Sequence, residues 1–284
     1  MSSRGAGAEL FIVIGAQRTG TNLLREILNT NDHIAMLGEV LTPSPAPGHW
    51  DNFCRTFSAD GRAFADYRET EALLDRYFDF VEYRIRNYWK NNRKANIQAF
   101  GVDIKYNYLT HIAPTDWDSA TCPPFILCYL RNRGAKFIHT TRNVIHSAIS
   151  TLIAFQRNLW HNYEGLVVER QYDIDIEACL SYARAITRNR ALFLDAVRGC
   201  TLVNCQYNRL VDDTKRSRDQ SEIPDGPGPL HEIASALQVP FQFRHDERLK
   251  KAINVPYSQL LSNYDDLVNR LCDSELSSLA SSLT

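Results

Sequence analysis

The chain combines short, mainly apolar segments with longer stretches of helical periodicity. Residues 10–14 form an unbroken apolar run that is too short for an ordinary helix and too apolar for a surface strand, so it predicts a buried strand of a parallel sheet. Three further short segments read as strands: residues 100–105, which end in a charged pair, 136–141 and 201–207.

Apolar residues spaced three or four positions apart predict helices between these strands. One helix is expected directly after residue 22, and others over residues 69–90, 144–154, 177–197 and 230–237 and from residue 264. The alternation of strand and helix predicts an α/β fold in a single domain over residues 1–284. Its central parallel sheet has four to five strands, with helices on both faces.

Two segments read as loops. Residues 31–62 carry prolines at positions 43, 45 and 47, which predicts a loop-rich insertion over the binding face. Residues 213–229 are polar and rich in Pro and Gly, which is typical of a mobile surface loop. The apolar stretch at residues 125–130 fits either a strand or a helix.

The segment between the first strand and the first helix has the features of an anion-binding turn. Gly15 and Gly20 bracket it, and a helix begins directly afterwards. The N–H groups and the positive dipole end of such a helix favour an anion. The turn also carries guanidinium, hydroxyl and amide donors: Arg18, Thr19, Thr21 and Asn22.

This turn departs from the phosphate loop of nucleotide triphosphatases, G-x-x-x-x-G-K-[ST]. The two glycines have the correct separation, but Thr21 stands in the Lys position and Asn22 in the position of the metal-binding hydroxyl. Arg18 is the one cation within the turn that can replace the missing Lys. A metal-dependent kinase-like phosphotransferase is therefore the weaker alternative.

The turn resembles the 5′-phosphosulfate loop of sulfotransferases that use 3′-phosphoadenosine 5′-phosphosulfate (PAPS). That loop commonly reads R-[ST]-G-[ST]-[ST]-hydrophobic, and residues 18–23 read R-T-G-T-N-L, with Asn22 as the departure. The resemblance implies the P-loop-like sulfotransferase fold, PAPS as donor, adenosine 3′,5′-bisphosphate (PAP) as its product, and no metal. It implies donor contacts from Arg18, Thr19, Gly20, Thr21 and Asn22.

Three further features extend the resemblance. Arg142 at a strand end and Ser150 eight residues later are similar to the family's 3′-phosphate motif. Tyr207 begins a segment similar to Y-E-x-L, with Asn208 in the Glu position, and lies near adenine in that comparison; a core tyrosine is the alternative. A C-terminal closing segment, residues 213–284, offers Arg248, Lys250 and Lys251. A single PAPS molecule can contact both the turn at residues 18–22 and Arg142 only if these two turns lie side by side.

Sulfuryl transfer requires a base for the acceptor hydroxyl and cations along the departing group. Glu39 in the Gly38-Glu39 segment resembles the base of bacterial carbohydrate sulfotransferases such as the trehalose enzyme. Lys105 lies at a strand end and is placed beside the transferring group, while Arg18 suits the leaving phosphate. Three histidines are rivals for the role of base: His111, His139 and His146.

The Gly38-Glu39 resemblance favours a carbohydrate or glycolipid hydroxyl as acceptor. Three tryptophans in or near predicted loops are candidates to stack on sugar rings, with core packing as the alternative: Trp50, Trp117 and Trp160.

Composition narrows the remaining functions. A net charge of −1 gives no long-range attraction to nucleic acid or anionic membrane. Seven cysteines without a C-x-x-C pair favour reduced thiols in the cytoplasm, and there is no apolar run of about 18 residues to span a membrane. A homodimer and a non-catalytic protein that binds a nucleotide or a partner remain open.

Overall fold

The computed structural model describes residues 8–57, 66–91, 94, 96–158, 171–219, 228–244 and 255–283. Its centre is a five-stranded sheet in the order β2-β3-β1-β4-β5, with every neighbouring pair parallel. The strands are β1 (Glu9–Gly15), β2 (Ile34–Glu39), β3 (Ala99–Lys105), β4 (Lys136–Thr141) and β5 (Leu202–Gln206). The predicted single α/β domain with a parallel sheet of four to five strands is confirmed.

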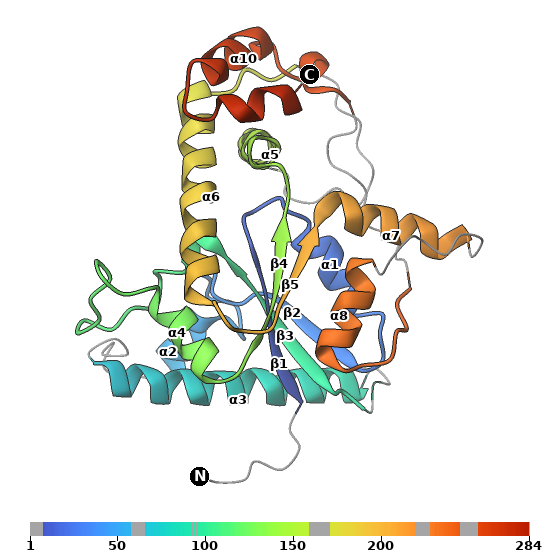
Figure 1. Cartoon of the computed structure of the whole chain (residues 1–284). Helices are drawn as coiled ribbons and strands as arrows, with labels where there is room; N and C mark the ends of the chain where they lie inside the picture. The colour runs from blue at the N-terminus through green and yellow to red at the C-terminus, as the bar shows by residue number, and fades with distance from the viewer. Residues whose placement is uncertain are drawn as a thin grey trace.

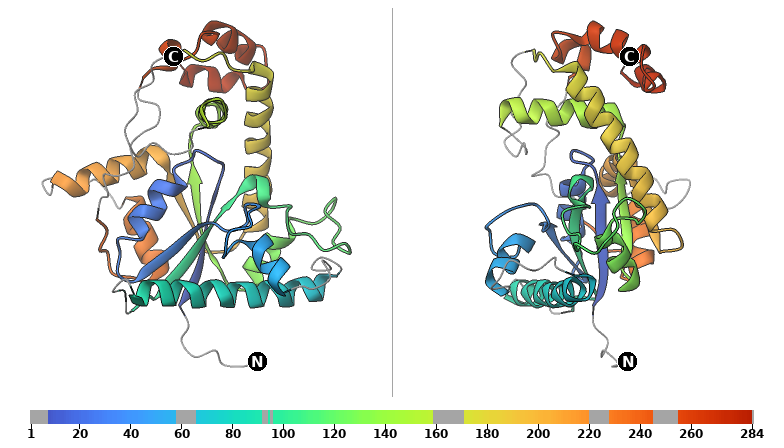
Figure 2. Two further views of the ribbon diagram at one scale, coloured as in Figure 1. Left: turned by 180° about the vertical axis from the view of Figure 1, so that it is seen from behind. Right: turned by 90° about the vertical axis from the view of Figure 1, so that its left-hand side faces the viewer.

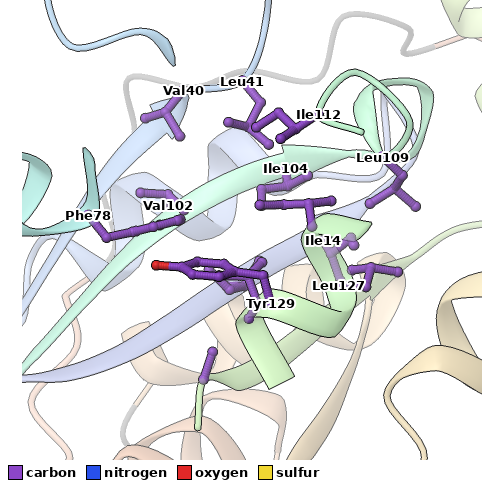
Figure 3. Close-up of a cluster of buried hydrophobic side chains, with 14 of the residues drawn as sticks. Ile14, Val40, Leu41, Phe78, Val102, Ile104, Leu109, Ile112, Leu127 and Tyr129 are labelled. Carbon is purple, nitrogen blue, oxygen red and sulfur yellow. The ribbon is translucent and has the colours of Figure 1, made fainter. Parts of the chain in front are cut away.

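Helices cover both faces of this sheet, as Figure 1 and Figure 2 show. Successive side chains of a strand point to opposite faces, so Ile12 and Ile14 enter one core while Phe11 and Val13 enter the other. The first core lies against α2 (Trp50–Phe57), α3 (Tyr67–Asn91), α4 (Phe125–Asn132) and the end of α6 (Ile176–Ala196), and Figure 3 shows part of it. The second lies against α1 (Thr21–Leu28) and α8 (Pro229–Leu237).

A third apolar core lies beyond the carboxyl ends of the strands. It joins α5 (Val144–Arg157) and α6 to three C-terminal elements: α9 (Tyr257–Leu260), α10 (Tyr264–Cys272) and the 3₁₀ turn η2 (Ser277–Ser282). Figure 1 shows this helical cap above the strand tips. Ligands of open α/β sheets bind at the carboxyl ends of the strands, so the space between sheet and cap is where a site is expected.

Two predicted loops contain regular structure. Residues 31–62 include β2 and α2, so the expectation of a loop throughout this stretch is wrong. The apolar part of β2 is only four residues long and Gly38 interrupts it; pairing with β3, which a local pattern does not reveal, makes it a strand. The three prolines lie in the connection between β2 and α2.

The second of these loops, residues 213–229, is helical over its first half. Helix α7 (Tyr207–Asp219) continues from β5, and α8 begins at Pro229. The Asp213 carboxylate in α7 accepts a hydrogen bond from the Leu230 N–H, which links α7 to the start of α8. The undecided stretch at 125–130 belongs to α4, and both the 3₁₀ turn η1 (Tyr106–Tyr108) and α9 were not predicted.

Lys94 fixes the connection between α1 and β2. Its ammonium donates to the carbonyl oxygens of Asn29, Asn31 and Ile34 at 2.5, 2.7 and 2.8 Å, and it lies 4.2 Å from the centroid of the Trp89 ring. An ammonium has three donors, and all three are used here. This contact holds α1, the helix that follows the predicted anion-binding turn, against the strand that ends at Glu39.

Candidate active site

The turn between β1 and α1 depends on two glycines. Gly20 caps α1 with φ of 89°, and an added Cβ would lie 2.5 Å from the Tyr207 ring. At Gly15 a Cβ would lie 2.2 Å from the Thr140 hydroxyl. Arg18 also adopts a left-handed conformation, with φ of 64°. The compact turn directs the start of α1 toward the strand ends, where its dipole favours an anion.

The two threonines of the turn face inward. The Thr19 hydroxyl donates to the Ala16 carbonyl at 2.8 Å and lies 3.0 Å from the Thr140 hydroxyl. The Thr21 hydroxyl accepts a hydrogen bond from Lys105. Both threonines are buried, so in this structure their hydroxyls shape the turn. Their predicted contacts to PAPS would therefore come from their backbone N–H groups.

The two predicted anion motifs meet in space. The Arg18 Nε donates to the Ser150 hydroxyl at 3.1 Å, and an Arg142 Nη donates to the Arg18 carbonyl at 3.2 Å. The Arg142 guanidinium also lies 4.9 Å from the centroid of the Tyr207 ring. Four residues predicted to bind PAPS therefore form one cluster: Arg18 from the first turn, Arg142 from the connection after β4, Ser150 from α5 and Tyr207 from α7. The requirement that both turns lie side by side is met.

The cluster concentrates positive charge. Burial lowers the pKa of Arg18, and the positive charge of Arg142 lowers it further. Within the described residues Arg142 has no carboxylate at ion-pair distance. Two guanidinium groups this close repel each other, and an anion between them would offset that repulsion. The arrangement suits a ligand with more than one negative charge.

Two neighbours of this cluster were missed in the sequence. The charge of Arg157 contributes to the lowered pKa of Arg18. It follows Ser150 by seven residues, two helical turns, so helical spacing after the motif could have identified it. Burial raises the pKa of Tyr257, which the nearby guanidinium groups of Arg142 and Arg18 oppose. Tyr257 comes from α9, and no local signal marks it.

A second cluster lies at the end of β3. The Lys105 ammonium lies 2.5 Å from Asp103 Oδ2 and 3.5 Å from Glu39 Oε1, and it donates to the Thr21 hydroxyl. Lys105 is 2 % exposed and Asp103 is fully buried. Burial raises the pKa of Asp103, and the adjacent ammonium opposes that rise. Lys105 therefore contacts both the start of α1 and Glu39, the predicted base.

Glu39 stands at the edge of this cluster. It ends β2 after a register irregularity, its Oε2 accepts from the Thr42 hydroxyl at 3.1 Å, and its side chain is 29 % exposed. Burial raises the pKa of Tyr182, and the negative charge of Glu39 adds to that rise. Tyr182 also donates to Gln17 Oε1 at 3.5 Å. A carboxylate next to a cation and open to one side can accept a proton.

The three rival histidines have other partners. His139 is fully buried between Tyr106 and Asn204, which contact its ring nitrogens at 2.5 and 3.1 Å. Burial lowers its pKa to about 4, so it is a neutral core residue. His111 contacts Asp51 at 3.1 Å, and the His146 ring contacts the Ser282 carbonyl at 2.9 Å.

The candidate tryptophans and C-terminal cations either pack in the protein or lie outside the residues that the structure describes. Trp50 is buried against Phe53 and Tyr77, and Trp117 stacks on Tyr67. Neither supports a sugar platform. Trp160 and the three C-terminal cations lie outside the described residues: Arg248, Lys250 and Lys251.

Three other features concern the described residues as a whole: disulfides, metal-ligand clusters and membrane-spanning helices. All seven cysteines are free thiols. In the described part of the chain, no three His, Cys, Asp or Glu side chains gather as a metal site. Among the helices described, none has the length and apolarity needed to cross a bilayer.

The fold and the site together define an α/β protein with a P-loop-like turn between β1 and α1. Residues 10–220 match the family model described as "Sulfotransferase family". Because this match covers more than half of the 284 residues, the chain belongs to the sulfotransferase family and is a sulfotransferase. A comparison with curated proteins found no match.

Two solved structures are similar at low identity. The sulfotransferase domain from the Synechococcus PCC 7002 olefin synthase is 16 % identical with a TM-score of 0.41, and the match covers 100 % of this chain and 96 % of that one. Sulfotransferase STF9 from Mycobacterium avium is 13 % identical with a TM-score of 0.42, over 95 % of this chain and 76 % of that one. The family assignment rests on the match over residues 10–220.

Proposed function

We propose that this sulfotransferase uses PAPS as its donor and transfers the sulfuryl group to a hydroxyl of a carbohydrate or glycolipid. The observation that supports PAPS as the donor is that the two predicted motifs touch. Arg18 hydrogen-bonds to the Ser150 hydroxyl, and Arg142 hydrogen-bonds to the Arg18 carbonyl. A donor with phosphate groups at its 5′ and 3′ positions matches two adjoining cationic turns.

Each end of this donor has residues suited to it. The backbone N–H groups of residues 19–22 and the Arg18 guanidinium suit the 5′-phosphosulfate. Arg142 and Ser150 suit the 3′-phosphate, and the Tyr207 ring, which packs over Gly20 and under Arg142, suits the adenine. Asn22 is the second residue of α1 and supplies an amide where the family commonly has a hydroxyl.

The proposed chemistry is an in-line displacement at sulfur. The acceptor oxygen forms a bond to sulfur as its proton passes to Glu39, and the bond between sulfur and the phosphate oxygen breaks. The products are the sulfated acceptor and PAP. Lys105 supplies positive charge next to Glu39 and the start of α1, and Arg18 stabilises the departing phosphate.

The acceptor class rests on Glu39. Its carboxylate is 29 % exposed and interacts electrostatically with Tyr182, whose hydroxyl donates to Gln17; these two side chains offer hydroxyl and amide groups for a polyhydroxylated molecule. The resemblance of Gly38-Glu39 to carbohydrate sulfotransferases points the same way. Two of the three candidate tryptophans, Trp50 and Trp117, do not add to it, because both pack in the protein.

A thermal-shift titration tests the donor. PAP without magnesium is expected to raise the melting temperature, because a ligand that binds only the folded state stabilises it by about 2.7 kcal/mol at 100 times its Kd. ATP with magnesium is expected to have no such effect, because Thr21 and Asn22 replace the Lys and the hydroxyl of a triphosphate loop. Stabilisation by ATP and magnesium alone would favour the kinase-like alternative, and no response to either would favour a non-catalytic role.

A variant pair tests the base and the acceptor. With radiolabelled PAPS and a panel of sugars, glycolipids, alcohols and phenols, Glu39→Gln should lower kcat by about 100- to 10,000-fold and leave PAP affinity unchanged. Glu26→Gln is the matched control, because Glu26 has the same 29 % exposure and lies on α1 paired with Arg25. Near-normal turnover in Glu39→Gln would refute its role, and transfer only to phenols would refute the acceptor class.

A further inference from the structure

Two charged side chains lie inside an otherwise apolar strand. In β3, Val102 and Ile104 enter the first core. By the alternation of a strand, Asp103 and Lys105 point to the opposite face, toward α1. Both are almost completely inaccessible to solvent. Asp103 pairs in register with Val13 of β1 and with Glu39 of β2, so it lies between two strands that end at the site.

The Lys105 ammonium is shared unequally among its neighbours. It lies 2.5 Å from Asp103 Oδ2 but 3.5 Å from Glu39 Oε1, and its other close partner is the Thr21 hydroxyl. The cation therefore pairs more closely with the buried carboxylate than with the half-exposed one. Asp103 Oδ1 has no hydrogen-bond partner, although it is buried.

Stability gives a poor account of this arrangement. Removing two charges from water is costly, and apolar residues of similar volume often serve as well or better. A buried carboxylate oxygen without a partner adds to that cost. Lys105 contacts both Glu39, the residue assigned as base, and Thr21 of the phosphosulfate turn, so the place of the pair in the site is the better explanation.

We propose that Asp103 is a positioning residue for sulfuryl transfer. It holds the Lys105 ammonium against Thr21 and away from a close ion pair with Glu39. The cation then remains at the start of α1, where negative charge develops on the leaving phosphate, and the Glu39 carboxylate remains able to accept the acceptor proton. This inference rests on the function proposed above for Glu39 and Lys105.

The test compares Asp103→Asn, Lys105→Met and the pair variant that carries both changes. Asp195→Asn is the control, because Asp195 is an exposed carboxylate at the end of α6 that pairs with Arg198. Three quantities are measured: kcat for transfer from radiolabelled PAPS to the best acceptor of the panel, or to water if none accepts; the Kd for PAP by calorimetry; and the melting temperature.

Asp103→Asn is expected to lower kcat at least about tenfold and to keep the Kd for PAP within about threefold, since it removes an interaction that matters in the transition state. The pair variant should match the kcat of Lys105→Met within about threefold, because Asp103 acts through Lys105. A kcat for Asp103→Asn within about threefold of the parent, or losses that multiply in the pair variant, would overturn the proposal.

Melting temperatures keep the test decisive if Asp103→Asn does not fold. The pair variant contains neither buried charge, so it should melt at a higher temperature than either single variant. A pair variant that is no more stable than the single variants would overturn the coupling. If the parent does not respond to PAP, the donor assignment fails, whereas the melting comparison still tests whether Asp103 and Lys105 act as a unit.

Discussion

Arg142 provides the sharpest test of the donor site. Arg142→Ala removes a guanidinium that donates to the Arg18 carbonyl at 3.2 Å and lies over the Tyr207 ring. A hydrogen bond to a charged group contributes about 1.5 to 3 kcal/mol, which corresponds to about a 10- to 150-fold weaker affinity for PAP.

The unliganded protein should respond differently. Arg142→Ala loses a hydrogen bond of about 1 kcal/mol and a cation–π contact of about 0.5 to 1 kcal/mol. It also removes the positive charge that helps to lower the pKa of Arg18, and this relief of repulsion offsets part of the loss. We therefore expect the free energy of unfolding without ligand to change by less than about 1 kcal/mol.

Calorimetric titration with PAP and thermal melting measure both effects. At a PAP concentration 100 times the parent Kd, stabilisation should fall from about 2.7 kcal/mol in the parent to about 1.4 kcal/mol or less in the variant. Arg198→Ala is the control, because Arg198 is 83 % exposed and pairs with Asp195 alone among the described carboxylates. Unchanged PAP affinity in Arg142→Ala, or an equal loss in Arg198→Ala, would refute the reasoning.

Two further predictions concern the turn and the core. Gly20→Ala should destabilise the protein by about 1 to 3 kcal/mol in urea unfolding and weaken PAP binding, because φ is 89° and the new Cβ meets the Tyr207 ring. Gly134→Ala, with φ of 77° and no atom within 4 Å of its Cβ, should show only the backbone cost; an equal effect in both would disprove the Tyr207 contact. For His139, burial sets a pKa of about 4, below that of the unfolded chain, so its contribution is complete above about pH 6.5 and is lost as the pH falls toward 4. The parent should lose about 2 kcal/mol more than His139→Gln between pH 7 and pH 5, and equal losses in parent and variant would contradict this.

Short, mainly apolar segments predicted four of the five strands. Residues 10–14 are an unbroken apolar run, which is typical of a strand buried on both faces, whereas β5 lies at the edge of the sheet and alternates buried with exposed residues. β2 escaped prediction because its apolar part is four residues long and its pairing partners in β3 lie 64 to 65 positions further along the chain. The same limitation applies to Lys94, which reads as one surface lysine among many but contacts three carbonyls near the turn before β2.

By itself the sequence determined the glycine-bracketed turn after β1, the spacing of Arg142 and Ser150 and the alternation of strand and helix, because each depends on residues close to one another along the chain. The tertiary structure alone decided that Arg18 meets Ser150, that Asp103 takes the closer pairing with Lys105, and that His139 is buried and neutral. These facts depend on the order of strands in the sheet and on the cap over their ends. Parallel pairing brings distant strand ends to one edge, and no local pattern specifies which ends become neighbours.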